Sequence, residues 1–376
     1  MSDSFSLEKH VLPKTLIFAG GVGGARFHKG FYDLFYGANR VKQSLGPDSV
    51  SHERNNLSGI TCKKSSPYTG FHDCTQSGSK PCFPSFSPDF PLHAVINTGD
   101  DFAWMGLKVC PDLDTNLYTL AELNNEERGW GLKNDTWSGL SMLKRWPENP
   151  CWFNLGDADL AFSLERTLLL REGLNLAQIC CRLAEGLGLK PEIWPMCLEE
   201  VTTYVDTYQG SLPFQEYFVK QKAKPLPTGF TYKGLDKAKP LPHLLELIQQ
   251  AQLILIAPSN PFVSILPILG LAGIKPALQK SPSLKIAISP LEGGRAFKGP
   301  LVEMLKAAQL PVSASGVAHL YRDWLDIFVM SSVDAPLGSS VEKMGIKPIF
   351  TDVTLSSPQD RSRLTTFVLD IAQKFS

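Results

Sequence analysis

The chain has no excess of charge of either sign. Lys and Arg together number 37, and Asp and Glu also number 37, so the formal net charge is zero. A protein that binds nucleic acid non-specifically usually carries a basic excess, so we do not expect nucleic acid as a partner. Any charged ligand must be recognised by local groups of charged side chains.

Long uninterrupted apolar runs are also missing. The longest apolar stretch, residues 253–274, is broken by prolines, serines and an asparagine, whereas a membrane-spanning helix needs about 20 predominantly apolar residues in a row. Residues Met1–Lys14 mix charged and polar groups and lack the basic start and apolar centre of a signal peptide. We therefore expect no membrane association and a cytoplasmic location.

Paired cysteine motifs are absent from the sequence as well. The chain has eight cysteines, and none of them forms a CxxC pair. Three of them, Cys62, Cys74 and Cys82, share one polar segment, but their spacing fits no standard zinc site. In a cytosolic protein we expect all eight to be reduced thiols.

Short apolar runs that alternate with helical patterns are what the sequence does contain. Alternation of this kind predicts an α/β fold, specifically a Rossmann-like, doubly wound, mainly parallel sheet with an inserted helical subdomain. The predicted buried strands are residues 15–19, 93–97, 253–257, 284–288 and 326–330.

The same patterns predict how the chain is organised. One large domain covers residues 14–335, and a Leu-rich helical subdomain occupies about 114–195 within it. Residues 38–91 are rich in Ser, Pro, Gly and Asn and show no sustained period, which predicts an inserted flexible loop. Residues 336–376 are predicted to form a C-terminal α/β extension that packs on the same domain.

The first candidate motif is a cluster of glycines after the first predicted strand, Gly20-Gly21-Val22-Gly23-Gly24-Ala25-Arg26. Glycines let backbone N–H groups approach a phosphate closely, and the start of the following helix adds partial positive charge. The alternative is a plain tight turn. The candidate substrate-binding residues here are Gly21, Val22, Gly23, Gly24 and Arg26.

A second motif, Asn97-Thr98-Gly99-Asp100-Asp101, follows the next predicted strand. Two adjacent carboxylates suit a hard divalent cation such as Mg²⁺ or a base beside such a cation. We therefore predict Asp100 and Asp101 to be catalytic and metal-binding, and Asn97 and Thr98 to contact substrate.

Two more aspartates lie a short distance downstream, in Pro111-Asp112-Leu113-Asp114. Either of them is near enough in sequence to complete a metal site, and we choose Asp114 as the third catalytic and metal-binding residue. The alternative for Asp114 is a helix cap, because a helical run follows it.

Two further segments supply candidate substrate contacts. Ser259 and Asn260 follow the predicted strand 253–257 and lie between two prolines, so they suit recognition of a nucleotide base or phosphate, with an ordinary turn as the alternative. Phe214 and Tyr217, in FQEYF, suit an aromatic wall for a planar ring, and an alternating strand explains them equally well.

Taken together and in order, these motifs resemble the 2-phospho-L-lactate transferase family (CofD). The inserted loop 38–91 departs from the compact members of that family but removes no motif. The matching segments are GGVGGAR at 20–26, NTGDD at 97–101, PDLDTNLYTL at 111–120, GWG at 129–131, TW at 136–137, WFNLGDADLA at 152–161, FQEYFV at 214–219, APSNPFVSILPIL at 257–269 and KGP at 298–300.

The resemblance implies a phosphotransferase of coenzyme F420 biosynthesis. The acceptor is the terminal ribityl hydroxyl of the deazaflavin Fo. The donor is a guanosine diphosphate that carries lactate, enolpyruvate or glycerate. GMP leaves, and F420-0 or its dehydro or glycerate variant forms. The resemblance also implies Mg²⁺ and a homodimer.

One rival from another class shares the glycine-loop fold, a nucleotide-sugar-binding regulator of the gluconeogenesis-factor type. In that pattern the Asp pair runs on into Gly-Gly-Ser-Ser, whereas here Asp100-Asp101 runs on into Phe102-Ala103-Trp104. The sequence therefore favours the transferase.

Overall fold

The computed structural model describes residues 12–37, 91–190 and 192–375. Its centre is a seven-stranded sheet in which every pair of neighbouring strands is parallel. Across the sheet the strands lie in the order β14 (Lys347–Thr351), β13 (Ile327–Ser331), β10 (Leu284–Ile288), β9 (Leu253–Ile256), β1 (Thr15–Ala19), β2 (Leu92–Ile96) and β5 (Ile193–Pro195). The predicted parallel α/β fold is confirmed.

Helices cover both faces of this sheet, and the alternation of side chains along β1 shows why. Leu16 and Phe18 belong to one buried apolar cluster, whereas Ile17 and Ala19 belong to a second cluster on the opposite face. A strand that is buried on both faces needs an unbroken apolar sequence, which is the pattern that predicted these strands.

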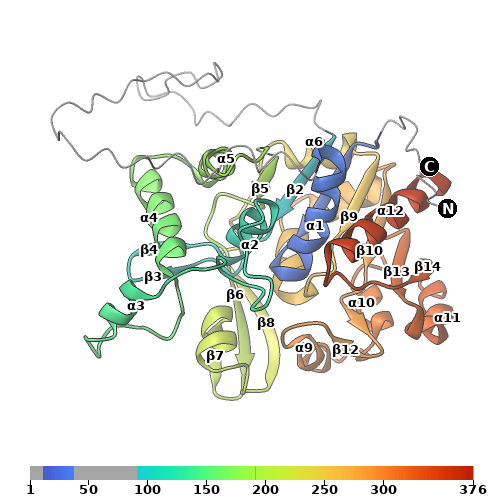
Figure 1. Ribbon diagram of the computed structural model, residues 1–376. Coiled ribbons are helices and arrows are strands. Elements are labelled where there is room, and N and C mark those ends of the chain that lie inside the picture. The colour runs from blue at the N-terminus through green and yellow to red at the C-terminus, as the bar shows by residue number, and fades with distance from the viewer. Residues whose placement is uncertain (1–11, 38–90, 191, 376) are drawn as a thin grey trace, which may run out of the picture.

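The first of these faces is covered by short helices from the second half of the chain, and the other face by longer ones. Those on the first face are α6 (Leu244–Gln250), α7 (Leu266–Leu269), α8 (Ile274–Lys280), α9 (Leu301–Ala307) and α10 (Ala314–His319). Those on the other are α1 (Gly21–Tyr36), α2 (Pro111–Leu120), α5 (Leu176–Gly186) and α12 (Pro358–Phe375), and α1 lies between α2 and α12 (Figure 1).

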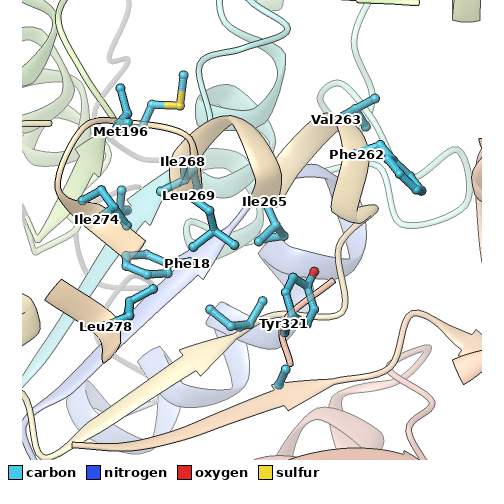
Figure 2. Close-up of a cluster of buried hydrophobic side chains, with 14 of the residues drawn as sticks. Phe18, Met196, Phe262, Val263, Ile265, Ile268, Leu269, Ile274, Leu278 and Tyr321 are labelled. Carbon is cyan, nitrogen blue, oxygen red and sulfur yellow. The ribbon is translucent and has the colours of Figure 1, made fainter. Parts of the chain in front are cut away.

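The apolar stretch from 253 to 274 folds as strand, turn and helices. The π-helical turn η4 (Pro261–Ile265) leads into α7, and the chain then bends by 83° into α8. Figure 2 shows Ile265, Ile268 and Leu269 packed over Phe18 of β1. Within the described ranges no single helix has the length and apolar composition to cross a membrane, and only this bent pair meets that test when its two parts are counted together.

The remaining elements lie at the edges of the sheet. The helices α3 (Ser138–Leu143) and α4 (Asp157–Arg171) pack with the hairpin β3–β4 at one side of the molecule (Figure 1). α5 starts at a capping box, because Asn175 Oδ1 accepts from the Gln178 amide at 3.0 Å and Gln178 Oε1 accepts from the Asn175 amide at 2.9 Å. The other elements are β3 (Phe102–Trp104), β4 (Leu107–Val109), β6 (Thr202–Thr207), β7 (Gly210–Pro213), β8 (Pro227–Lys233), β11 (Leu291–Glu292), β12 (Arg295–Ala296), the helical turns η3 (Glu216–Lys220) and η5 (Ser332–Leu337), and α11 (Gly338–Glu342).

The boundaries of two predicted segments differ from the structure or lie beyond it. The helix expected to follow the glycine cluster begins at Gly21, so the cluster is its first turn and not a separate loop. The predicted insertion 38–91 lies outside the described residues except for Pro91. The last strand and helix, β14 and α12, join the central sheet and α1.

Candidate functional site

Three of the sequence motifs meet because three neighbouring strands end at the same edge of the sheet. The glycine cluster follows β1, Asn97–Asp101 follows β2, and Pro258–Asn260 follows β9. β1 pairs with β2 on one side and with β9 on the other. Later strands then follow outward on both sides, β5 beyond β2 and β10, β13 and β14 beyond β9. Such a switch point beyond the carboxyl ends of parallel strands is where ligands bind in open α/β sheets.

Gly20 and Gly21 bring the first turn of α1 against Asp112 at the start of α2. The Gly21 amide donates to Asp112 Oδ1 at 2.6 Å, and Gly21 has a φ of 61°, which favours glycine. A Cβ at Gly20 would overlap Asp112 Oδ2 and lie 2.6 Å from Ser264 Cβ. Glycine at position 20 therefore makes room for the Asp112 carboxylate.

Gly23 and Gly24 bring the same turn against the loop after β9. A Cβ at Gly23 would lie 2.5 Å from the Pro258 carbonyl oxygen, and a Cβ at Gly24 would lie 2.6 Å from Ser259 Oγ. The buried Ser259 hydroxyl donates to the Gly20 carbonyl at 2.7 Å. These glycines thus allow close packing of the chain on itself. The interpretation of the cluster as a phosphate-binding loop did not predict this packing role.

A buried pair of carboxylates lies at the centre of the site. The Asn97 side-chain amide Nδ2 donates to Asp112 Oδ2 at 2.9 Å and also to Asp100 Oδ1 at 3.2 Å. Gln215 Nε2 donates to the other oxygen of Asp100 at 3.1 Å. Asn97 therefore connects the two acids, and Gln215 connects Asp100 to the segment that contains Phe214.

Burial and mutual repulsion alter the acidity of this pair. Burial, followed by the nearby Asp112 and Asp101 charges, holds the pKa of Asp100 well above its usual range. Burial raises the pKa of Asp112 to about 6, although the hydrogen bonds from Asn97 and Gly21 act in the opposite direction. Two desolvated carboxylates this close favour a bound cation or a shared proton.

Asp101 points to a different set of partners. Its Oδ2 lies 3.2 Å from Lys108 Nζ on β4 and accepts from Cys110 Sγ at 3.0 Å. Burial raises the pKa of Asp101, and Lys108 is the largest opposing cause. Asp101 thus already has a cationic partner within the protein. Thr98 is also buried, and its hydroxyl lies 3.8 Å from Cys197 Sγ.

Asp114 does not take part in the Asn97 hydrogen bonds. Its Oδ1 forms an ion pair with Arg166 of α4, whose side chain is only 1% exposed. Burial raises the pKa of Asp114 to about 7, while the Arg166 charge opposes that shift. The structure therefore brings Asp112 to Asp100, where the sequence had favoured Asp114. The N-cap residue of α2 is Cys110, and Asp114 lies inside the first turn of that helix.

The segment predicted to supply an aromatic wall, which contains Phe214 and Tyr217, is built differently from what we expected. The segment forms the helical turn η3, and its strand alternative is wrong. Tyr217 is fully buried in the core, and Phe214 is 7% exposed. The exposed ring is that of Phe218, which is 39% exposed and stacks on Phe214 with ring centroids 5.5 Å apart.

Two more of the predicted contacts, Asn260 and Arg26, have structural roles that can be described. Asn260 Oδ1 accepts from the Phe262 amide at 3.1 Å and so caps the turn η4. The Arg26 guanidinium donates to the Glu126 carbonyl at 3.1 Å and is only partly exposed.

The residues present fit a magnesium ion that arrives with a phosphate ligand. Within the described residues no group of three or more His, Cys, Asp and Glu side chains is arranged to hold a metal. Mg²⁺, however, is commonly bound through one or two carboxylates with substrate phosphates and water completing its shell. Asp100 and Asp112 match that requirement better than Asp101, which Lys108 neutralises.

Sequence reasoning missed Gln215 and Phe218 and weighed Asp112 without choosing it. Gln215 and Phe218 both belong to FQEYF, but their roles depend on a helical turn that the pattern did not reveal. Asp112 and Asp114 are only two positions apart, so their spacing in the sequence does not show which of them lies against Asp100.

The fold and its site define an α/β protein whose polar loops meet at the switch point of a parallel sheet. The family model of the 2-phospho-L-lactate transferase CofD matches residues 85–361, and the chain belongs to this family.

Individual relatives agree with this assignment. The chain is 35% identical over 286 residues to a 2-phospho-L-lactate transferase of Methanopyrus kandleri, which covers 74% of this chain and 89% of that protein. It is 37% identical over 291 residues to a phosphoenolpyruvate transferase of Kitasatospora aureofaciens, with 74% and 89% covered. A phosphoenolpyruvate transferase of Thermobifida fusca is 30% identical over 364 residues, with 96% and 98% covered.

Among solved structures, the chain is similar to a member of the UPF0052 family from Bacillus halodurans. The TM-score is 0.53 at 14% identity, and the match covers 94% of this chain and 98% of that one. This likeness concerns the fold alone.

Proposed function

We propose that this protein transfers a phospho-acid group from its guanosine diphosphate adduct to the terminal ribityl hydroxyl of the deazaflavin Fo. The acid is lactate, enolpyruvate or glycerate, and the product is F420-0 or its dehydro or glycerate variant. Membership of the family and the names of its relatives support a transferase of this type. The observation that carries the proposal is the pair of carboxylates, Asp100 and Asp112, joined by Asn97. The pair lies between the glycine-rich first turn of α1, which we call the glycine turn, and the segment that contains Phe214.

The reaction is a displacement at phosphorus. The ribityl oxygen forms a bond to the phosphorus that carries the acid, and the bond from that phosphorus to the bridging diphosphate oxygen breaks. GMP leaves with that oxygen, and the hydroxyl proton passes to a carboxylate. Phosphoryl transfer depends mainly on positioning and charge neutralisation, and the buried pair of Asp100 and Asp112 supplies a proton acceptor at one side of the glycine turn.

We assign the donor to the glycine turn and the acceptor to the aromatic side. First-turn amides of a helix such as α1 have no intrahelical acceptor and favour an anion, which suits the donor phosphates near Val22–Gly24 and Arg26. The exposed Phe218 ring, stacked on Phe214, suits the planar deazaflavin. Gln215, in the same segment as Phe214 and Phe218, donates to Asp100, so we expect a hydroxyl attached to a ring system bound here to reach the carboxylate.

Magnesium is part of the proposal. Asp100 and Asp112 would hold the ion. Asp101 follows Asp100 in the chain, and its carboxylate forms an ion pair with Lys108. When bound, Mg²⁺ neutralises charge on the diphosphate. A cytoplasmic homodimer is also proposed from the family resemblance, and light scattering on the purified protein measures the oligomeric state.

The test is a transfer assay read by mass spectrometry. Purified protein, Fo and Mg²⁺ are mixed separately with the lactyl, enolpyruvyl and glyceryl guanosine diphosphates. The expected result is GMP together with the matching phosphodiester of Fo for one donor, and loss of both when the metal is chelated. Asp100→Asn should abolish turnover in a folded protein, whereas Asp323→Asn, on an exposed aspartate with a 71% exposed side chain, should not. No turnover with any donor, in a protein that still binds a nucleotide-diphosphate sugar, would favour the regulator.

A further inference from the structure

The C-terminal helix α12 packs directly against α1, the helix that begins with the glycine turn. Gly30 lies at the contact, since a Cβ there would overlap Thr365 Oγ1 and would lie 3.0 Å from the Arg361 carbonyl oxygen. Figure 1 shows the two helices side by side. This contact brings the Arg361 side chain, which is 9% exposed, to the segment that follows α2.

Arg361 is linked to Arg26 through one glutamate. Arg361 Nη1 lies 3.3 Å from Glu126 Oε1, and Arg26 Nη2 donates to the Glu126 main-chain carbonyl at 3.1 Å. The Arg361–Glu126 ion pair therefore fixes the backbone that Arg26 binds. Arg26 lies about one helical turn beyond the glycines at the start of α1.

Lys298 reaches the same segment from another part of the chain. It lies between β12 and α9, and its Nζ donates to the Arg128 main-chain carbonyl at 3.1 Å. At Gly129, where φ is 74°, a Cβ would overlap the Lys298 ammonium group and would lie 3.4 Å from Val22 Cγ1. Glycine at this position lets the ammonium group lie close to the first turn of α1.

Positive charge is in excess among these side chains. Within residues 12–37, 91–190 and 192–375, Arg26 and Lys298 form no ion pair, and Glu126 is the carboxylate that pairs with Arg361. After burial, the Arg361 charge is the next cause that lowers the pKa of Arg26, and the Arg26 charge likewise lowers the pKa of Lys298. Arg26 and Lys298, two cations near the first turn of α1, are therefore arranged to receive an oxyanion with more than one negative charge.

We propose that Arg26 and Lys298 bind the diphosphate of the donor beside the first turn of α1, and that Arg361 positions Arg26 through Glu126. The inference rests on the proposed transfer for the identity of the donor, but the binding itself does not require transfer. It makes the C-terminal helix a part of the donor site. It also gives Lys298 a role in binding the diphosphate, which the sequence motifs did not establish.

The test measures binding by isothermal titration calorimetry, with GDP, inorganic pyrophosphate and guanosine as the probes. Lys298→Ala and Arg26→Ala should each weaken GDP and pyrophosphate binding by about ten- to a hundredfold, the usual range for one charge-assisted hydrogen bond. Guanosine binding should stay unchanged. In the transfer assay the same variants should raise the donor KM and leave the Fo KM unaltered.

The role of Arg361 needs variants that preserve packing. Arg361→Met keeps most of the unbranched apolar stem and removes the guanidinium group, and Glu126→Gln removes only the charge. Each should weaken GDP binding about tenfold with the binding stoichiometry unchanged, and the double variant should be no worse than the weaker-binding single variant. Arg363→Met is the matched control on the same helix, because Arg363 pairs with Asp352 and is 37% exposed. It should bind GDP normally.

Several results would overturn the inference. Equal weakening of guanosine binding, a drop in stoichiometry without a change in affinity, or full additivity of Arg361→Met and Glu126→Gln would each contradict it. Normal GDP binding in Lys298→Ala would do the same. If GDP affinity depended on Arg26 and Lys298 as expected but no donor supported transfer, the anion site would be supported and the transferase proposal refuted.

Discussion

Arg166 and Asp114 form an ion pair in the interior of the protein, between α4 and α2. Both side chains are shielded from water, and Arg166 also donates to the Lys108 carbonyl at 3.1 Å. Removing one charge of such a pair leaves the other buried without compensation, which typically costs about 3–5 kcal/mol. Asp114→Asn should therefore lower the free energy of unfolding by roughly that amount, measured by urea denaturation.

The control for this prediction is an exposed pair on neighbouring helices. Glu165 and Arg182 lie 3.7 Å apart with side chains that are 46% and 60% exposed. Glu165→Gln should change stability by less than about 1 kcal/mol. If Asp114→Asn were equally mild yet eliminated turnover, Asp114 would be a catalytic residue as the sequence predicted and not a structural one.

Gly20 is predicted to tolerate no side chain. The methyl group in Gly20→Ala would displace Asp112 or Ser264, and overpacking of this kind costs about 1–3 kcal/mol. Transfer activity should fall further than stability, because Asp112 would leave Asn97. Gly186→Ala is the matched control: no atom lies within 4 Å of its added Cβ, and Ala at this helical position should be neutral or stabilise by up to about 1 kcal/mol. Equal activities in the two variants would contradict the close approach at Gly20.

Phe218 is predicted to serve the acceptor and not the donor. Its exposed ring stacks on Phe214, and an aromatic pair of this type contributes about 0.5–1.5 kcal/mol. Phe218→Ala should therefore raise the KM for Fo by roughly two- to tenfold and leave the donor KM unchanged, as measured by steady-state kinetics. Tyr208→Ala, which removes a ring that is 92% exposed, should alter neither constant. A donor-specific effect of Phe218→Ala would reverse our assignment of the two sides.

Glu192 is predicted to make the protein less stable as the pH rises. Burial raises its pKa to about 7 from an ordinary value near 4.5. The folded state therefore holds a proton that the unfolded chain releases, so the stabilisation is complete below pH 4.5 and disappears as the pH rises through 7. Glu192→Gln should remove this dependence and stabilise the protein at pH 8 by roughly 1–3 kcal/mol. Melting temperatures at pH 5 and pH 8 measure the effect. An equal change in melting temperature between these pH values for the unsubstituted protein and for Glu192→Gln would refute it.

The sheet was predictable because its strands are buried on both faces. Thr15–Ala19 and Leu284–Ile288 have the predicted bounds, since a short run of mainly apolar residues bounded by polar residues or glycine leaves a strand few alternatives. The meeting of the glycine cluster with Asn97 and Ser259 was also predictable, because parallel strands that are neighbours end at one edge.

The partners of individual polar side chains were not predictable. Gly21 and Asp112 are 91 positions apart, and Asp100 and Gln215 are 115 apart. Choosing Asp112 over Asp114 requires the rotation of α2 about its axis, which the pattern PDLD does not encode. The turn η3 (Glu216–Lys220) was ambiguous for a similar reason, since five residues of mixed character fit a strand or a helical turn equally well.

The position of β1 has a consequence for the synthesis of the chain. Thr15–Ala19 precedes Leu253–Ile256 in the chain, so it must wait for that later segment before both edges of the strand are hydrogen-bonded. Until then a mostly apolar strand has at most one neighbour, and unpaired strand edges of this kind invite association between nascent chains. We therefore expect expression at reduced temperature to raise the soluble yield of this protein.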